Sequence, residues 1–421
     1  MGIRALSHRN YRLFFTGQII SVVGSWMQSV AQAWLVYRLT GSELLLGLVG
    51  FADRVPVFLL GLVGGMVADR LDRHRVVIAT QAASMLQALV LGVLVTAGVA
   101  QVWHIFVLAT VLGVISAFDL PARQSFISAM VERDDLPNAL ALNSSVFNAA
   151  RVIGPALAGV VVATIGEGPC FLLNGLSYLA VIICLYRMRL DARPLRSLAS
   201  PLEQLVEGLR FSAGAPPVRA LLVLLGLVSI CGIPYVILMP VFVAHVLGGG
   251  ARELGMLMGA SGAGAFFAAV CLARRRSVQG LGRVVAAGSI GFGLSLVGFA
   301  LSRSFLLSAL ILVAVGFFMI TQAAAANLLL QSLSPDGLRG RVMSLYTIMF
   351  VGMAPWGSLL AGSVAHVVGT PATVAIGGVL CALAGCVFAM RIPALRPFIK
   401  YPIPESPLPS RPRVDTGRDG F

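Results

Sequence analysis

Charged side chains stand inside long apolar stretches of this chain, where a lipid bilayer would leave them without water. Asp53, Arg54 and Arg151 could do chemistry there, as could Asp119 and Arg123 at the end of the stretch near 102–120. Ionisable groups inside a membrane are costly, and they usually face a cavity or one another. An acid and a base that change partners as a protein changes shape can take up and release a proton. We therefore expect these five residues to act in proton coupling or in ion pairs, with permanent pairs that only hold helices together as the alternative.

Asp53 is the first candidate for a proton carrier. It lies about nine residues, or roughly 14 Å at 1.5 Å per residue, from the outer end of its expected span. Arg54 is adjacent in sequence, but neighbouring helix positions point about 100° apart and need not meet. Arg151, also expected near the midplane, is a second possible partner in one conformation only. Asp119 is the next candidate carrier.

Amide and aromatic side chains form a second polar set within the apolar stretches. Gln28 and Gln32 lie one turn apart with Trp34 nearby, and Gln322 and Asn327 lie in a later stretch. We expect these five residues to line a substrate cavity, although amides can equally bond neighbouring helices. They bring little charge, which favours a large, moderately polar or aromatic cargo over sugars or inorganic ions.

No set of residues with catalytic spacing accompanies them. The sequence has no P-loop, no His-Glu zinc motif and no nucleophile elbow. Its six cysteines lack metal-ligand spacing and fall in or beside hydrophobic stretches. We therefore expect no catalytic residue, no cofactor and no metal, and a protein that is not an enzyme.

Composition places these residues in a membrane protein. The 421 residues are 58% hydrophobic and 11% charged, with a mean hydropathy of +0.91, whereas soluble domains carry roughly 25% charged residues. The formal net charge of +14 does not indicate nucleic-acid binding, because the basic residues punctuate hydrophobic segments instead of clustering on a polar domain. Lysine occurs once, at Lys400, which with abundant Ala, Gly and Arg hints at a GC-rich bacterial source.

Apolar runs between charges predict an all-α polytopic membrane protein with twelve transmembrane helices. At about 20 residues per span, they fall near 13–37, 44–68, 76–98, 102–120, 139–163, 169–188, 219–245, 254–273, 284–301, 305–330, 341–366 and 372–391. The loops on the side of the termini hold 26 Lys and Arg residues, against 3 on the opposite side. The positive-inside rule therefore places both termini in the cytoplasm.

The spans divide into two halves that resemble each other. We expect a six-helix bundle at 1–188, a cytoplasmic linker at 189–218, a second six-helix bundle at 219–391 and a disordered cytoplasmic tail at 392–421. The linker contains a capping box that opens at Ser200, followed by an amphipathic helix. A shift of 203 residues aligns the two halves without a gap over about 35 residues, pairing glycines as in Gly154 with Gly357 and Gly159 with Gly362. Such weak symmetry is expected of transporters whose halves rock about a midplane site.

The loop after the second span carries a recognisable signature. Residues 64–75 read GGMVADRLDRHR, which resembles the major facilitator superfamily motif G-x-L-A-D-R-x-G-R-R, with Val67 and Asp72 as departures. The resemblance implies the major facilitator fold and a cytoplasmic gate formed by Gly65, Asp69, Arg70 and Arg73. It also implies that Asp69 contacts the start of the eleventh span, near residues 340–341, when the inside is closed.

Further runs narrow the resemblance. Gly154, Pro155 and Gly159 in the fifth span resemble the antiporter motif G-x-x-x-G-P-x-x-G-G, although alanines replace two of its glycines. Three further runs resemble sequences of the superfamily branch that contains enterobactin exporter-like proteins. They are FDLPARQ at 118–124, DDLPNA at 134–139 and EGLRF at 207–211. This resemblance covers nearly the whole chain to about residue 395 and leaves the cargo open.

The sequence thus predicts a secondary active transporter of a bacterial inner (cytoplasmic) membrane, acting as a monomer. We expect it to export a drug-like or siderophore-like small molecule in exchange for protons, by alternating access. Its expected partners are the small-molecule substrate, protons and the lipid bilayer, and no nucleic acid. Uptake or flipping of an amphiphile such as a lysolipid, or a polytopic membrane enzyme, remain the alternatives.

Overall fold

The computed structural model describes residues 4–132, 134–188, 201–274, 279–335 and 337–400; within these ranges the side chains of residues 69, 201–205 and 394–400 lie outside the description. The part so described is built of helices joined by turns and contains no β-strand. Twelve of its helical segments are long and apolar enough to cross a membrane. The expected all-α polytopic class with twelve spans is confirmed.

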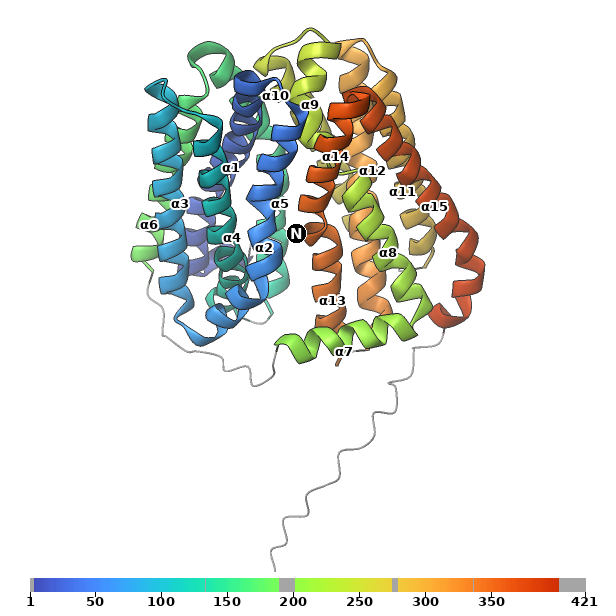
Figure 1. The fold of residues 1–421 in the computed structure, drawn as a ribbon. Coiled ribbons are helices and arrows are strands. Elements are labelled where there is room, and N and C mark those ends of the chain that lie inside the picture. The colour runs from blue at the N-terminus through green and yellow to red at the C-terminus, as the bar shows by residue number, and fades with distance from the viewer. Residues whose placement is uncertain (1–3, 133, 189–200, 275–278, 336, 401–421) are drawn as a thin grey trace, which may run out of the picture.

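The first six spans lie together on one side of the molecule, coloured blue to green in Figure 1. In this N-terminal bundle α1 packs against α5 and α6, α2 against α4, and α3 against α4 and α6. After a short 3-10 turn, η1 (Arg4–Ser7), its helices are α1 (Arg9–Thr40), α2 (Glu43–Arg70), α3 (Arg73–Thr96), α4 (Val102–Met130), α5 (Leu136–Ile165) and α6 (Gly168–Tyr186).

The last six spans form the C-terminal bundle, in which α12 packs against α10 and α11, and α15 against α11. Two of these spans are interrupted. The seventh divides into α8 and α9, and the eleventh contains a π-helical turn, η2, between α13 and α14. The elements are α8 (Pro216–Cys231), α9 (Tyr235–Val246), α10 (Ala251–Ala273), α11 (Leu281–Leu301), α12 (Phe305–Leu333), α13 (Arg339–Thr347), η2 (Ile348–Gly352), α14 (Ala354–Val368) and α15 (Thr370–Lys400).

Local capping explains where the early helices begin and end. The Ser42 hydroxyl accepts a hydrogen bond from the backbone N–H of Leu45 at the start of α2 (3.3 Å), and the Asp72 carboxylate accepts one from the N–H of His74 at the start of α3 (3.0 Å). Gly41 ends α1 with φ of 59°, a left-handed conformation that favours glycine. Asp72, a departure from the superfamily motif, therefore has a local task as the cap of α3.

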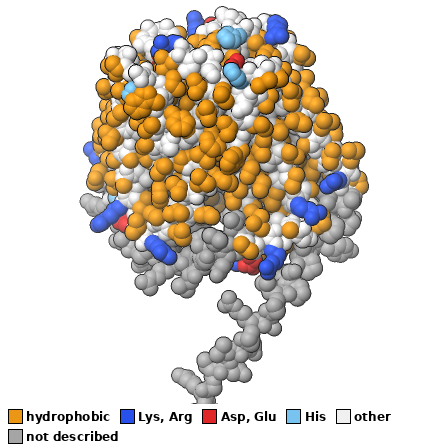
Figure 2. Space-filling model, in the orientation of Figure 1, with side chains coloured by type: hydrophobic (Ala, Val, Ile, Leu, Met, Phe, Trp, Pro, Cys, Tyr) orange, Lys and Arg blue, Asp and Glu red, His pale blue; other side chains and the backbone are white. Residues whose placement is uncertain are grey.

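A broad apolar surface covers the visible face of the two bundles. In Figure 2 hydrophobic side chains cover the middle of the visible face, and Lys and Arg side chains lie mainly toward its two ends. Leu59 of α2 and Leu310 of α12 are each 63% exposed, for example. A continuous apolar band of this kind suits contact with lipid tails.

The helix α7 (Pro201–Gly214) crosses one end of the C-terminal bundle and packs on α13 and α8 (Figure 1). We call this end the linker end and the opposite one the distal end. The expected capping residue, Ser200, lies outside the described residues. The last helix, α15, continues to Lys400 instead of ending near residue 391, because residues 391–400 still carry mostly apolar side chains and the polar composition of the tail begins later.

The two bundles meet along two pairs of helices, α5 with α10 and α2 with α14. In the first pair a Cβ built on Gly255 would lie 2.4 Å from the carbonyl oxygen of Pro155 and 2.7 Å from Cα of Gly159. No side chain fits at this crossing, so glycine is required for the two backbones to touch. Gly159 stands near the distal end of α5 and Gly255 near the distal start of α10.

The second pair repeats this geometry. A Cβ on Gly47 would lie 2.7 Å from the carbonyl oxygen of Ser358, and one on Gly362 would lie 2.8 Å from Cα of Gly47. Ser358 and Gly362 follow Pro155 and Gly159 by 203 residues, the shift that aligns the two halves in sequence. The internal repeat therefore builds the same glycine crossing twice, and both crossings close the distal end.

Toward the linker end the bundles draw apart (Figure 1). Phe147, in the first half of α5, is 52% exposed. A Cβ on Gly65, near the end of α2, would meet nothing within 4 Å. The close contacts between the bundles thus lie toward the distal end, and these two positions toward the linker end are free of such contacts.

Candidate functional site

Arg151 occupies the middle of α5 at the boundary between the bundles. Its guanidinium carbon lies 5.8 Å from the centroid of the Trp26 ring in α1, and its Nη2 lies 3.9 Å from the sulfur of Met319 in α12. No carboxylate among the described residues lies within ion-pair distance of it. The structure therefore brings Arg151 to both halves of the protein but does not pair it with Asp53.

Asp53 instead pairs with its neighbour in α2. Nε of Arg54 donates to Oδ2 of Asp53 at 3.0 Å, and the two side chains are 26% and 54% exposed, respectively. Arg54 stands on the same stripe of α2 as Phe51 and Phe58, which both pack edge-on against Trp356 of α14. The pair thus lies on the side of α2 that faces the other bundle, where it can respond to rocking of the two halves.

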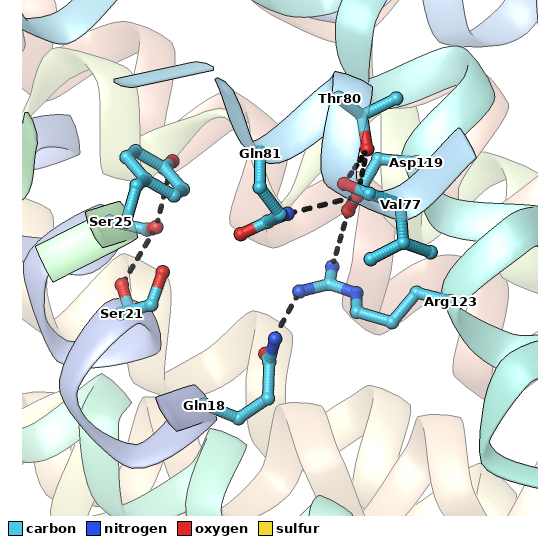
Figure 3. Close-up of polar contacts among 9 residues, drawn as sticks. Gln18, Ser21, Ser25, Val77, Thr80, Gln81, Asp119 and Arg123 are labelled. Atoms are coloured by element: carbon cyan, nitrogen blue, oxygen red, sulfur yellow. Dashed lines mark hydrogen bonds and ion pairs between the residues drawn. The ribbon is translucent and has the colours of Figure 1, made fainter. Parts of the chain in front are cut away.

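A buried polar network surrounds Asp119 inside the N-terminal bundle (Figure 3). The Asp119 side chain is 10% exposed, and one of its oxygens accepts hydrogen bonds from the Thr80 hydroxyl at 2.8 Å and the Gln81 amide at 3.0 Å, both in α3. Its other oxygen lies 3.3 Å from Nη2 of Arg123, one turn along α4. Arg123 Nη1 donates to the amide oxygen of Gln18 in α1 at 3.2 Å. The network ties α1, α3 and α4 together through one carboxylate.

Gln18 and Gln81 belong to this network although they were not predicted from the sequence as site residues. Each has a buried amide atom without a hydrogen-bond partner in the part of the chain that the structure describes. Nε2 of Gln18 and Oε1 of Gln81 are buried and have no hydrogen-bond partner among the described residues. Buried unsatisfied amides are costly, and they often mark a place where a water or a changed conformation supplies the partner. Their polarity within apolar spans is the signal that could have singled them out.

The first-span amides have separate environments. Gln28 is 3% exposed, donates to Oε1 of Gln87 in α3 at 3.1 Å, and accepts from Nδ2 of Asn174 in α6 at 2.7 Å. This placement fits the alternative in which amides bond neighbouring helices. Trp34 packs against Tyr37 (5.6 Å between ring centroids), which in turn packs against His245 of α9 (5.7 Å), so the aromatic contacts of α1 reach the C-terminal bundle. Gln32 is partly exposed.

The amides of α12 lie within or beside the C-terminal bundle. Gln322 is fully buried, its backbone and Cβ lie about 3 Å from the position of a Cβ on Gly288 in α11, and neither of its amide atoms has a partner among the described residues. Asn327 accepts a hydrogen bond from Gln331 at 2.6 Å, one turn away. The structure does not bring these two residues together with Gln28, Gln32 and Trp34 into one site.

The structure describes the gate motif only in part. The backbone of Asp69 belongs to α2, but its side chain lies outside the description. Arg70 is exposed, and Nε of Arg73 donates to the carbonyl oxygen of Ala68 at 3.2 Å. Arg341, at the start of the eleventh span, forms an ion pair with Glu207 of α7. The start of the eleventh span is thus tied to the linker helix, and the expected contact of Asp69 with this region stays a prediction.

The antiporter motif forms the contacts of α5 with two other helices. A Cβ on Gly154 would lie 2.5 Å from Cβ of Trp26, so this glycine sets the approach of α1. Pro155 and Gly159 take part in the crossing with α10 described above. The motif residues thus determine how closely α5 approaches α1 in its own bundle and α10 in the other bundle.

Sequence reasoning missed the two interrupted spans. Ser229 of α8 donates from its hydroxyl to the carbonyl oxygen of Phe350, at 2.9 Å, inside the π-helical turn η2. Broken helices in transporters lie near the binding site, because only a buried or cavity-lining place tolerates irregular backbone. Gly232 with Pro234, and Gly352 with Pro355, were the available signals.

The comparisons with known proteins agree with this architecture. A family described as "Transmembrane secretion effector" matches residues 2–409. The staphyloferrin A transporter of Staphylococcus aureus is 27% identical (87% of this chain, 92% of the relative), and the multidrug efflux pump Tap of Mycolicibacterium fortuitum is 26% identical (89% and 93%). The enterobactin exporter EntS of Citrobacter koseri is 22% identical (94% and 95%).

A solved structure shows the same fold. It is that of a bacterial homologue of the human lysosomal transporter Spinster, in an inward-facing and occupied conformation, with a TM-score of 0.73, 14% identity and coverage of 93% of this chain and 98% of that one. The family match spans nearly the whole sequence, and the resemblance stated from the motifs is confirmed. The chain therefore belongs to the transmembrane secretion effector family of major facilitator transporters, and it is a small-molecule transporter, not an enzyme.

Proposed function

We propose that this protein exports a drug-like or siderophore-like small molecule from the bacterial cytoplasm in exchange for protons, by alternating access. It sits in the inner membrane with both termini in the cytoplasm and works as a monomer. The relatives named for staphyloferrin A, enterobactin and multidrug efflux support this range of cargo.

The proposal rests mainly on the difference between the two ends of the interface between the bundles. Glycine crossings at Gly47 and Gly255 close the distal end, and Phe147 and Gly65 mark the open linker end. The excess of basic residues, 26 Lys and Arg against 3, supports placing the linker end in the cytoplasm. With that orientation the structure corresponds to an inward-facing state, which supports entry of a cargo from the cytoplasm.

We place proton coupling in the N-terminal half because the Asp119 and Arg123 charges have no counterpart in the C-terminal half. The 203-residue shift places Gln322 opposite Asp119 and Ala326 opposite Arg123. Both halves share the glycine crossings, so the scaffold does not need these charges. We assign coupling to the Asp53–Arg54 pair, which faces the other bundle, and to the Asp119–Arg123 pair, which joins α3 and α4.

Inside-out and right-side-out membrane vesicles test the proposal. An imposed proton gradient, acidic inside, should drive a panel of fluorescent drug-like compounds into inside-out vesicles that contain the protein, and collapse of the gradient should stop uptake. A fluorescent lysolipid serves as the rival cargo. Gradient-independent movement of the lysolipid alone, or accumulation only in right-side-out vesicles, would replace export by flipping or uptake.

A further inference from the structure

Arg151 is a membrane-embedded cation whose described surroundings contain no anion. Among the described residues its guanidinium contacts the face of Trp26 and the sulfur of Met319, and Tyr235 of α9 lies near it. A cation–π contact contributes only about 0.5–2 kcal/mol, whereas an arginine at the centre of a bilayer costs at least about 2.5–3.5 kcal/mol on insertion scales. The two contacts therefore leave the charge undercompensated in this state.

The packing of α5 does not explain the arginine. The residue at the repeat-related position, 203 residues later, is Ala354. The glycines that follow it make the same approaches in both halves: a Cβ on Gly154 would lie 2.9 Å from the carbonyl oxygen of Val23, and one on Gly357 would lie 2.6 Å from that of Ile230. Helix packing works with alanine in one half, so the charge in the other half serves something else.

The surroundings of Arg151 have the properties of a ligand subsite. Trp26 and Arg151 come from the N-terminal bundle and Met319 from the C-terminal bundle, so a molecule held there touches both rocking halves. Phe147, one turn nearer the linker end, packs edge-on against Trp26 (5.6 Å between centroids) and is 52% exposed. Gly262 of α10 packs close to the backbone of Arg151, since a Cβ there would lie 2.7 Å from the Arg151 carbonyl oxygen.

We propose that Arg151, Trp26, Phe147 and Met319 form the subsite that recognises an aromatic organic anion as cargo. The guanidinium would bind a carboxylate or sulfonate through two parallel hydrogen bonds. The indole and phenyl rings would stack on the aromatic body, and the flexible thioether of Met319 would adapt to its shape. The inference rests on the proposed function and narrows its cargo to molecules that supply the missing negative charge.

Two dyes that share a xanthene ring test the charge preference. Fluorescein is an aromatic carboxylate, and rhodamine 123 is a cation of similar size. Fluorescence anisotropy with the purified full-length protein measures binding of each dye, and transport into inside-out vesicles under an imposed proton gradient measures movement. The unmodified protein should bind fluorescein more tightly than rhodamine 123.

Three substitutions separate the roles of the residues. Arg151→Gln should weaken fluorescein binding by about tenfold or more, the loss expected for a charge-assisted hydrogen bond, and leave rhodamine 123 unaffected. Arg151→Lys should retain part of the affinity for fluorescein, because lysine keeps the positive charge but lacks the paired N–H donors of the guanidinium. Met319→Glu should supply an internal acid partner and exclude fluorescein while admitting rhodamine 123. Arg303→Gln, at an exposed arginine of the distal end, is the matched control.

The outcomes are distinct. Equal binding of the two dyes by the unmodified protein, or fluorescein binding unchanged in both Arg151→Gln and Met319→Glu, would overturn the subsite. Fluorescein binding that is intact in Arg151→Gln while proton-driven transport of every dye is lost would make Arg151 a coupling residue and also overturn it. Charge-selective binding without proton-driven movement of either dye would support the subsite and refute the proposed export.

Discussion

Replacing Gly47 by alanine should open the distal end of the transporter. The added methyl group would lie 2.7 Å from the carbonyl oxygen of Ser358 and 2.9 Å from Cα of Gly362. Both neighbours are backbone atoms of α14, so no side-chain rotation relieves the clash. The helices would have to separate by about 0.7 Å to bring 2.7 Å up to the 3.4 Å at which ordinary contact begins.

The size of the effect follows from where the clash acts. Overpacking of a close contact costs about 1–3 kcal/mol. This cost falls on the distal-closed state alone, because the crossing no longer exists once the bundles part at that end. A bias of about 1–3 kcal/mol shifts a two-state equilibrium by roughly 5–150-fold.

Gly61→Ala is the matched control on the same helix. A Cβ at Gly61 would meet nothing within 4 Å. Alanine in place of glycine favours the helix by up to about 1 kcal/mol, but α2 is helical in both states of a rocking mechanism. This substitution should therefore stabilise the protein without changing the balance between the states.

Pulsed electron paramagnetic resonance can measure the separation of the bundles. Spin labels at Val99 and Val367, which are 55% and 81% exposed at the distal ends of the two bundles, report their distance in a background without the six native cysteines. Gly47→Ala should add a population at longer distance. Gly61→Ala should reproduce the distribution of the parent.

An unchanged distribution for Gly47→Ala, in protein that elutes as the parent does, would refute the assignment of this crossing to distal closure. Equal widening in Gly61→Ala would refute it as well, because it would show a general loosening of α2. The symmetric substitution Gly255→Ala, whose methyl group would lie 2.4 Å from the carbonyl oxygen of Pro155, should widen the distance too.

Three further predictions concern orientation, coupling and the linker. A reporter fused after Lys400 should be active only in its cytoplasmic form, and periplasmic activity would reverse the assigned orientation. Asp53→Asn should fold and bind cargo but lose pH-driven export, and full pH-driven export by this variant would leave Asp119 as the carrier. Glu207→Gln should raise hydrogen–deuterium exchange in α7 by up to about fivefold, the effect of losing an ion pair worth about 0.2–1 kcal/mol; unchanged exchange would mean that the pair with Arg341 does not hold the helix.

Much of the fold could be predicted because a membrane span is a local property. Twenty apolar residues in a row need no partner to be recognised, and the twelve expected spans match twelve membrane-length segments. The repeat was also readable, since aligned glycines such as Gly159 and Gly362 occupy equivalent crossings in the structure. The last helix runs past the expected boundary at residue 391 to Lys400, because residues 391–400 are mostly apolar.

Partner choice could not be read from the sequence. The sequence left open whether Asp53 meets Arg54, because ideal helix geometry points neighbouring side chains about 100° apart. In the structure the long arginine side chain reaches back to the carboxylate at 3.0 Å. Gln28 is a polar residue within an apolar span, as an amide that lines a cavity would be. Its hydrogen bonds nevertheless go to Gln87 and Asn174 within the N-terminal bundle.

The sequence by itself determined the membrane class, the number of spans, the repeat and the residue types that carry charge into the apolar region. Only the tertiary structure decided which of those charges are paired. Arg123 meets Asp119 four residues away, but Arg151 meets Met319 from 168 residues away and no described carboxylate. The physical reason is that hydropathy and helix period act over one or two turns, whereas the neighbours of a buried side chain are set by how twelve helices cross.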